Sequence, residues 1–281
     1  MIRDIFESFN IDTYAFIEGD ACEKNHPRLF ASLPSGVRAV FFLMPYYVSD
    51  VDDKISAYGA VYDYHAFAKD VFSSLEGYFD ENYPNEYRRG FCDHSPYIEV
   101  LGAAKAGLGV IGENSLLITK KYSSYVFIGT FVTTLSAAAL LAEGINEGAG
   151  VAEHCTGCGL CKAACPSGCL ERGSRDGCAS AVTQKKGALT EDEVLLLKKS
   201  KSIWGCDRCQ AVCPYTKRAI EKGTIYTKID YFKSSFMGKD PSLFVKGLDD
   251  EEFSRYPFSW RKREVIERNI EIIKSGESEN G

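Results

Sequence analysis

The sequence predicts an α/β (or α+β) N-terminal domain followed by a ferredoxin-like domain that holds two [4Fe-4S] clusters. Apolar runs typical of strands alternate with helix-like segments over roughly the first 140 residues. Nine of the eleven cysteines then fall between positions 155 and 213. A chain of 281 residues is long enough to bury a core in each of two such domains.

The spacing of apolar residues gives the expected elements of the first domain. The continuous apolar run VRAVFFLM is rich in β-branched and aromatic residues, which favours a buried strand. The segment YDYHAFAKDVFSSLEGYF instead repeats its apolar residues at helical spacing. Helices are expected over 1–20, 62–79 and 95–106, and strands over 37–44, 115–119 and 125–134.

The sequence of the second half predicts a connecting segment and two helices. The whole chain is expected to divide into three parts. The stretch 140–154 is glycine-rich and acidic, which suits a connection. Thr190 and Glu193 have the spacing of a capping box that opens a helix. A basic and then amphipathic helix is expected over 260–274. The expected divisions are a catalytic domain, a cluster domain and a C-terminal extension, over 1–145, 146–225 and 226–281.

Composition points to the cytoplasm and to metal chemistry. The first residues, MIRDIFESFN, lack the basic and apolar regions of a signal peptide, and no apolar run approaches the roughly 18 residues that span a membrane. Cysteines in a cytoplasmic protein favour metal binding over disulfides. The net charge is −6, with −10 over residues 1–197 and +4 over 198–281. A polyanion is therefore expected at the C-terminal third, although a solvated charged surface would look the same.

The cysteine spacing predicts two cubane clusters. Residues 155–166, CTGCGLCKAACP, have the C-x2-C-x2-C-x3-C-P pattern of two-cluster ferredoxins, in which the fourth cysteine binds the other cluster. Residues 206–214 repeat this pattern in part. Cluster one is thus assigned to Cys155, Cys158, Cys161 and Cys213, and cluster two to Cys165, Cys206 and Cys209. The eighth ligand is Cys169 or Cys178, and Cys178 is favoured because it has enough chain to return. Structural zinc is the alternative, but it does not explain the Cys-Pro endings.

Several segments resemble the epoxyqueuosine reductase family of cobalamin-dependent iron–sulfur enzymes. They are YDYH at 62–65, DHSPYIEVLGAAKAGLGVIGENSLLI at 93–118, the double-cluster block with Cys178, and FSRYPFSWRKREVIERN at 253–269. The resemblance implies bound cobalamin, two [4Fe-4S] clusters, an external low-potential electron donor and a tRNA substrate. Many family members continue into a C-terminal helical repeat domain, whereas this sequence ends soon after the basic helix.

The glycines of GLGVIG, residues 107–112, also spell G-x-G-x-x-G. A dinucleotide site needs a strand before this sequence and a helix after it, and here the expected order is reversed. The glycines are instead expected to let backbone approach the corrin ring. The cobalamin contacts implied by the resemblance are Asp63, His65, Gly107, Gly109, Gly112 and Asn114. His65 sits in a D-x-H-x-x-A sequence, and the family does not require it as a cobalt ligand.

Asp93 is the predicted catalytic acid, because the resembled family has an aspartate at this position that faces the cobalt. Reductive removal of an epoxide oxygen takes two electrons and two protons, so the departing alkoxide needs a proton donor. A carboxyl in an apolar pocket has its pKa raised and can stay protonated. The alternative role is a helix cap, since Pro96 and a predicted helix follow.

The predicted function is conversion of epoxyqueuosine to queuosine in tRNA. Arg261, Lys262 and Arg263 are the candidate phosphate contacts, with an ordinary helix start as the alternative. Two other functions remain open. One is a corrinoid reductase that acts on a small-molecule electrophile. The other is a two-cluster electron-transfer protein or corrinoid-protein activator, for which the N-terminal domain is larger than needed.

Overall fold

The computed structural model describes all residues except 50, 151–153, 233–238 and 279–281. Contacts divide the chain into two compact units. The first unit contains Met1–Pro45 and Tyr64–Thr156, and the second contains Tyr46–Asp63 and Gly157–Gly281. Segment 46–63 therefore joins the second unit, whereas the sequence placed it in the first. The three independent domains expected from the sequence stay a prediction.

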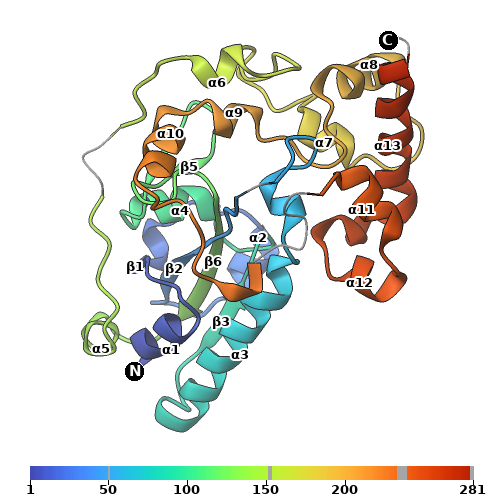
Figure 1. The fold of residues 1–281 in the computed structure, drawn as a ribbon. Helices are drawn as coiled ribbons and strands as arrows, with labels where there is room; N and C mark the ends of the chain where they lie inside the picture. The colour runs from blue at the N-terminus through green and yellow to red at the C-terminus, as the bar shows by residue number, and fades with distance from the viewer. Residues whose placement is uncertain (50, 151–153, 233–238, 279–281) are drawn as a thin grey trace. The chain divides into compact units, whose positions relative to one another are not determined.

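The first unit is built on an antiparallel sheet with the strand order β1-β2-β6-β3 (Figure 1). A separate pair, β4-β5, forms a short hairpin after helix α4. The helices are α1 (Ile2–Ser8), α2 (Pro27–Ala31), α3 (Tyr64–Asn82), α4 (Glu99–Lys105) and α5 (Ala137–Ala142), with a 3-10 turn η1 (Gly19–Ala21). The strands are β1 (Tyr14–Glu18), β2 (Arg38–Pro45), β3 (Arg88–Phe91), β4 (Val110–Ile111), β5 (Leu117–Ile118) and β6 (Val126–Thr133).

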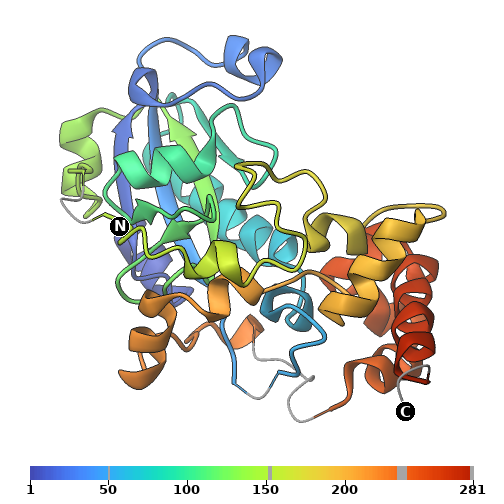
Figure 2. The same ribbon diagram turned by 90° about the horizontal axis from the view of Figure 1, so that it is seen from above.

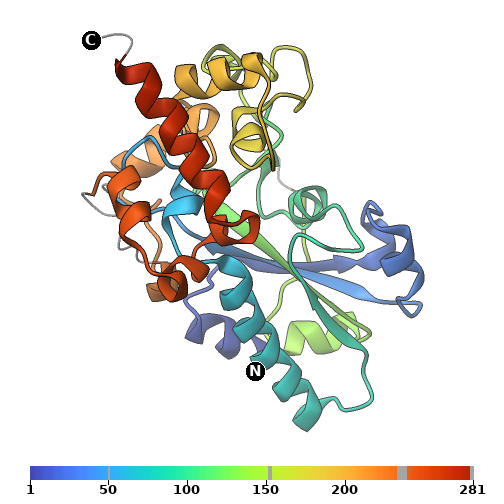
Figure 3. The ribbon, with the colours of Figure 1, turned by 90° about the vertical axis from the view of Figure 1, so that its right-hand side faces the viewer.

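Strand β2 reads as a continuous apolar run because helices cover both of its faces. Helix α4 covers one face of the sheet (Figure 2), and there Phe41 belongs to a cluster with residues of α4 such as Ala103. Helices α1 and α3 cover the other face (Figure 3), and there the ring of Phe42 contacts Phe6 of α1 and Phe72 of α3. Burial on both faces removes the alternation of polar and apolar residues that a half-exposed strand would show. The α/β (α+β) fold class is confirmed.

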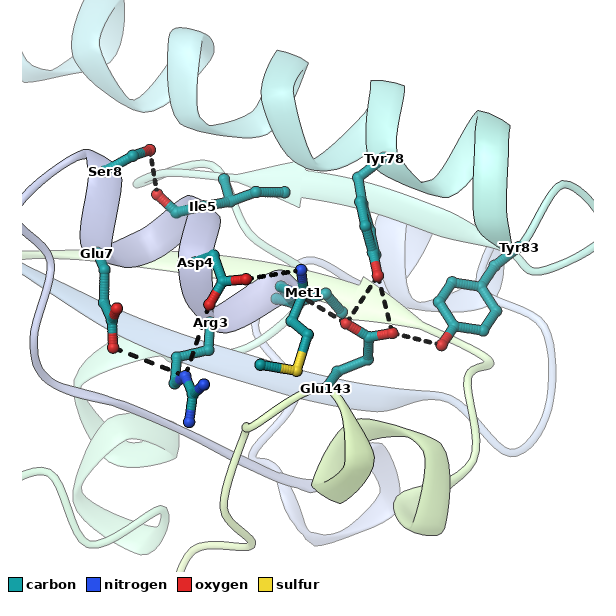
Figure 4. Close-up of polar contacts among 10 residues, drawn as sticks. Met1, Arg3, Asp4, Ile5, Glu7, Ser8, Tyr78, Tyr83 and Glu143 are labelled. Atoms are coloured by element: carbon teal, nitrogen blue, oxygen red, sulfur yellow. Dashed lines mark hydrogen bonds and ion pairs between the residues drawn. The ribbon is translucent and has the colours of Figure 1, made fainter.

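The buried carboxylate of Glu143 joins the ends of three helices in the first unit. It accepts a hydrogen bond from the backbone N–H of Ile2 at 2.8 Å. The hydroxyl groups of Tyr78 and Tyr83 donate to it at 3.0 and 2.5 Å (Figure 4). These bonds outweigh the cost of burial and lower the pKa of Glu143. The N-terminal helix α1 is thereby held against α3.

The first 20 residues form less helix than expected. Helix α1 ends at Ser8, and Tyr14–Glu18 is strand β1, paired with β2. The expected connection 140–154 also begins inside helix α5, which ends at Ala142, and residues 151–153 lie outside the described part of the chain. The other expected helices and strands are present with shifted ends.

The second unit has a core around Trp204, Tyr256 and Phe258, to which η2, α11, α12 and α13 also contribute. Helices α7, α8 and α13 pack against one another. The buried amide of Asn269 in α13 donates to the carbonyls of Thr183 and Ile203 at 2.7 and 2.8 Å. Helix α8 begins with the predicted capping box of Thr190 and Glu193. The elements are η2 (Ala57–Ala60), α6 (Leu160–Ala163), α7 (Ala179–Thr183), α8 (Glu191–Ser200), α9 (Arg208–Ala211), α10 (Pro214–Glu221), η3 (Asp230–Phe232), α11 (Pro241–Gly247), α12 (Asp250–Ser254), η4 (Pro257–Arg261) and α13 (Arg263–Ser278).

Candidate functional site

Asp93 lies on the loop that follows strand β3, with its backbone in the left-handed region at φ 62°. The Tyr64 hydroxyl donates a short hydrogen bond to Asp93 Oδ2. His65 Nε2 lies 3.4 Å from the same oxygen. Tyr64 is itself held by stacking on Phe127 of β6, with ring centroids 3.9 Å apart. The start of helix α3 and the sheet therefore present a phenol, an imidazole and a carboxylate together at one edge.

Glu99 fixes the backbone of the Asp93 loop through a hydrogen bond, a role that the sequence did not predict. Its Oε2 accepts the backbone N–H of Asp93 at 2.9 Å, and its Oε1 accepts the Thr130 hydroxyl at 2.9 Å. A left-handed backbone at a non-glycine residue is strained and persists only where its surroundings fix it. Glu99 supplies that fixing contact. It is also the first residue of α4, whose N-cap is Ile98, so the helix-cap role considered for Asp93 is wrong.

The two carboxyls titrate in opposite directions. Burial raises the pKa of Glu99 to about 8, with a smaller contribution from the charge of Asp93. Burial also acts to raise the pKa of Asp93, but hydrogen bonds from His65 and Tyr64 outweigh it, and the pKa is lowered. In the chain by itself the two donors stabilise the charged form of Asp93, and the raised pKa expected for this carboxyl in an apolar corrin pocket stays a prediction.

Stability measurements of Glu99→Gln test the raised pKa. Between the unfolded pKa of about 4.3 and the folded pKa of about 8, the folded chain holds a proton that the unfolded chain releases. The parent therefore loses stability as pH rises through this window, whereas glutamine stays neutral. We expect the variant to gain about 4 kcal/mol relative to the parent between pH 5 and 9 in urea unfolding. For the exposed control Glu251→Gln, the free energy of unfolding should change with pH in parallel with that of the parent. The same parallel dependence for Glu99→Gln would contradict the raised pKa.

The predicted cobalamin contacts fall in three places. His65 contacts Asp93, as described above. Gly107, Gly109, Gly112 and Asn114 lie together in and before the β4-β5 hairpin, and Asp63 belongs to the second unit. A Cβ at Gly109 would come within 2.6 Å of the Ile118 carbonyl oxygen, and one at Gly107 within 2.1 Å of the Ala149 carbonyl oxygen. These glycines are thus explained by close packing within the chain. Their contact with a corrin stays a prediction.

The two cysteine motifs fold into matching short helices. Helix α6 contains Cys161 and helix α9 contains Cys209, and these helices pack against each other. The residues after them, Ala164 and Val212, share φ −81° and ψ −9°. The cysteine that comes next donates its N–H three residues back at 3.1 Å in both copies. The sequence repeat is therefore a structural repeat, with Cys-Pro at equivalent positions.

Three of the four thiols predicted for cluster two, those of Cys178, Cys206 and Cys209, interact electrostatically. Burial is the main cause that raises the pKa of Cys209 to about 12, with smaller contributions from the charges of Cys206, Asp207, Cys178 and Cys161. The charge of Cys178 also contributes to a raised pKa of Cys206. Cys178 itself is the N-cap residue of α7. None of the eleven cysteines, all of which lie in the described part of the chain, forms a disulfide, so this donor set fits an iron–sulfur cluster. The placement favours Cys178 as the fourth ligand of cluster two.

Cys169 lies beside the same group. Its Sγ is 3.5 Å from Cys165 Sγ, and its side chain is almost fully buried. Cys169, the alternative fourth ligand of cluster two, is therefore close to Cys165 in space as well as in sequence. Among the residues that the structure describes, no three His, Cys, Asp or Glu side chains converge on a single metal ion.

The three basic residues predicted to contact phosphates differ in their surroundings. Arg263 donates to the carbonyls of Val245, Leu248 and Asp249, which it holds at the end of α11. The Arg261 guanidinium stacks on the exposed Trp260 ring at 3.5 Å. Lys262 is exposed. Arg263 thus has a structural role, and the phosphate contacts of Arg261, Lys262 and Arg263 stay a prediction.

Unfolding of Arg263→Gln tests this structural role. Loss of a charged donor to three carbonyls is expected to lower the free energy of unfolding by about 2 kcal/mol. Arg261→Gln, two residues away, is expected to change it by less than about 0.5 kcal/mol. Urea unfolding of the two variants gives the comparison. Equal effects at both positions would show that Arg263 does not hold α11.

The fold and the cysteine motifs define a two-cluster iron–sulfur protein with an attached antiparallel α/β unit. Residues 154–216 match the family described as "4Fe-4S double cluster binding domain". Within the described residues, no helix is long and apolar enough to cross a membrane.

The comparisons support the resemblance to the epoxyqueuosine reductase family. It is 27% identical to the epoxyqueuosine reductase of Listeria monocytogenes over 96% of this chain and 72% of that protein. It is 31% identical to that of Francisella cf. novicida over 72% of this chain and 54% of that protein. The chain thus spans between about half and three quarters of these relatives.

Two solved structures share the fold. The epoxyqueuosine reductase of Streptococcus thermophilus matches with a TM-score of 0.77 and 24% identity, covering 98% of this chain and 80% of that one. An epoxyqueuosine reductase crystallised with an epoxyqueuosine-modified tRNA-Tyr stem loop also gives a TM-score of 0.77, at 20% identity and the same coverage.

Proposed function

We propose that the chain is a cobalamin-dependent iron–sulfur reductase that converts epoxyqueuosine to queuosine in tRNA. The observation that carries the proposal is the Asp93 group, which pairs a carboxylate with two donors, in one chain with two cluster-binding motifs. Relatives named epoxyqueuosine reductase support the reaction. The structure of one such enzyme with a modified tRNA stem loop supports tRNA as the substrate.

The reaction needs two electrons and two protons, because an epoxide becomes an alkene and its oxygen leaves as water. The cysteines assigned to the two clusters would hold the groups that pass electrons one at a time from an external low-potential donor. Cobalamin, when bound, would supply a strongly reducing centre. Asp93 and His65 have side chains 61% and 52% exposed, so both can face a bound corrin and substrate. The exposure of these two side chains is therefore compatible with a cobalamin bound beside them.

One of the two protons comes from the Asp93 group, and the other comes from water. In the chain alone, hydrogen bonds from His65 and Tyr64 lower the pKa of Asp93, so the proton of each contact stays on its donor. Binding of an apolar ring would remove water and raise the pKa of the carboxyl, which makes it a better acid. Glu99 positions the group by holding the Asp93 backbone. The protein's contribution is thus a positioned proton beside the departing oxygen.

Retention of cobalamin tests this proposal. The clusters are reconstituted anaerobically, hydroxocobalamin is added, and the protein is desalted before its spectrum is recorded with and without dithionite. We expect about one corrin per chain to co-elute and to respond to reduction. Intact clusters with no retained corrin would overturn the proposal and favour an electron-transfer protein.

A further inference from the structure

Helix α10 and the turn after it carry a basic surface that neither the clusters nor the Asp93 group uses. We call this the α10 patch, and it comprises Lys217, Arg218, Ile220, Lys222, Tyr226 and Lys228. All six residues are exposed. The only acidic residue between 214 and 228 is Glu221, so the segment carries a net charge of +3. No ion pair involves any of its four cations in the part of the chain that the structure describes.

The α10 patch begins at a predicted cluster ligand. Cys213 is the N-cap of α10, and the Lys217 backbone N–H donates to the Cys213 carbonyl at 3.1 Å. Lys217 and Arg218 therefore lie within about one and a half turns of a thiolate assigned to cluster one. The buried side of the helix, at Thr216 and Ala219, fixes its rotation and leaves the cations outside.

The composition of the patch favours a protein over a nucleic acid. Ile220 is 39% exposed and lies between Arg218 and Lys222 in the sequence, so the patch carries an apolar side chain as well as its charges. Small, transient redox complexes use such surfaces, in which opposite charges steer the encounter. RNA binding favours several aromatic rings for stacking, and the patch offers only Tyr226, whose ring also lies 5.7 Å from Tyr47.

We propose that the α10 patch docks an acidic electron-donor protein, which delivers electrons to the cluster bound through Cys213. In each encounter one electron leaves the donor and reduces one [4Fe-4S] cluster, with no proton or bond exchanged. The proposal rests on the clusters of the proposed function but does not depend on its substrate.

The test compares two double variants with the same change in charge. Lys217→Glu/Arg218→Glu alters the patch, and Arg28→Glu/Lys186→Glu is the control at exposed positions elsewhere. The probe is a reduced, acidic plant-type [2Fe-2S] ferredoxin, mixed with the cluster-loaded chain at low salt without tRNA. Cluster bleaching gives the second-order rate, and dithionite, a small reductant, shows that both variants hold reducible clusters.

We expect the patch variant to be reduced by ferredoxin at least about tenfold more slowly than the parent and to lose the salt dependence of the rate. The control should stay within about twofold, and dithionite should reduce all three alike. An unchanged ferredoxin rate, with weaker binding of a tRNA stem loop instead, would overturn the proposal and identify a nucleic-acid surface. Because tRNA is absent from the rate measurement, a wrong substrate assignment would leave its result unchanged.

Discussion

Asp93→Asn is expected to lower turnover of epoxyqueuosine in tRNA by at least about 100-fold, the usual contribution of a positioned acid. Asparagine has nearly the same shape and its side-chain oxygen still accepts a hydrogen bond from the Tyr64 hydroxyl, but it cannot take up a proton and donate it to the substrate. The loss should therefore appear in kcat rather than in KM. Turnover is measured on the chain loaded with clusters and cobalamin, by mass spectrometry of the digested nucleosides.

Two matched variants separate chemistry from structure. Glu99→Gln keeps an acceptor for the Asp93 N–H, so it should retain most of the activity. Glu99→Ala removes that acceptor and should lose activity while Asp93 is still present. Cluster absorbance should match the parent in all three variants. Full activity in Asp93→Asn would show that Asp93 is not the acid.

Cys178→Ala is expected to remove cluster two and leave cluster one. The charge of Cys178 contributes to the raised pKa values of both Cys206 and Cys209. Replacing Cys178 therefore removes one of the four thiolates assigned to cluster two. Iron should fall from about eight to about four atoms per chain, and turnover should be abolished because the electron path is broken. Iron analysis and electron paramagnetic resonance of the reduced protein give the measurement.

Cys169→Ala is the matched control, because Cys169 is also near Cys165 and is more deeply buried than Cys178. It should keep about eight iron atoms per chain, with a modest loss of stability from the small cavity. The opposite pattern, with iron lost on replacing Cys169 and kept on replacing Cys178, would exchange the two assignments.

Short-range sequence patterns were enough to predict the cysteine motifs and most of the helices and strands. The Cys-Pro endings and the Thr190 capping box depend only on nearby residues, and both have regular local geometry in the structure. The strand β1 was missed because Tyr14–Glu18 becomes a strand by pairing with β2, a partner more than 20 residues away. Tertiary pairing of this kind leaves little trace in a short window.

The candidate site shows the same division. Asp93 was found through family resemblance, but its pKa direction depends on Tyr64 and His65, which the fold brings from another helix. Glu99 looked like an ordinary residue at a helix start, and only the bond to the Asp93 N–H reveals its role. Arg263 looked like a phosphate contact because its three carbonyl partners lie up to 18 residues earlier. Long-range partners decide such roles.

The most direct test of the central claim is turnover by the parent chain. The cluster-loaded protein, with and without cobalamin, is given reductant and tRNA that carries epoxyqueuosine, and the nucleosides are analysed by mass spectrometry. We predict loss of one oxygen atom, giving queuosine, only when both cobalamin and reductant are present. Unchanged epoxyqueuosine in the presence of intact clusters, bound corrin and reductant would contradict the proposed function.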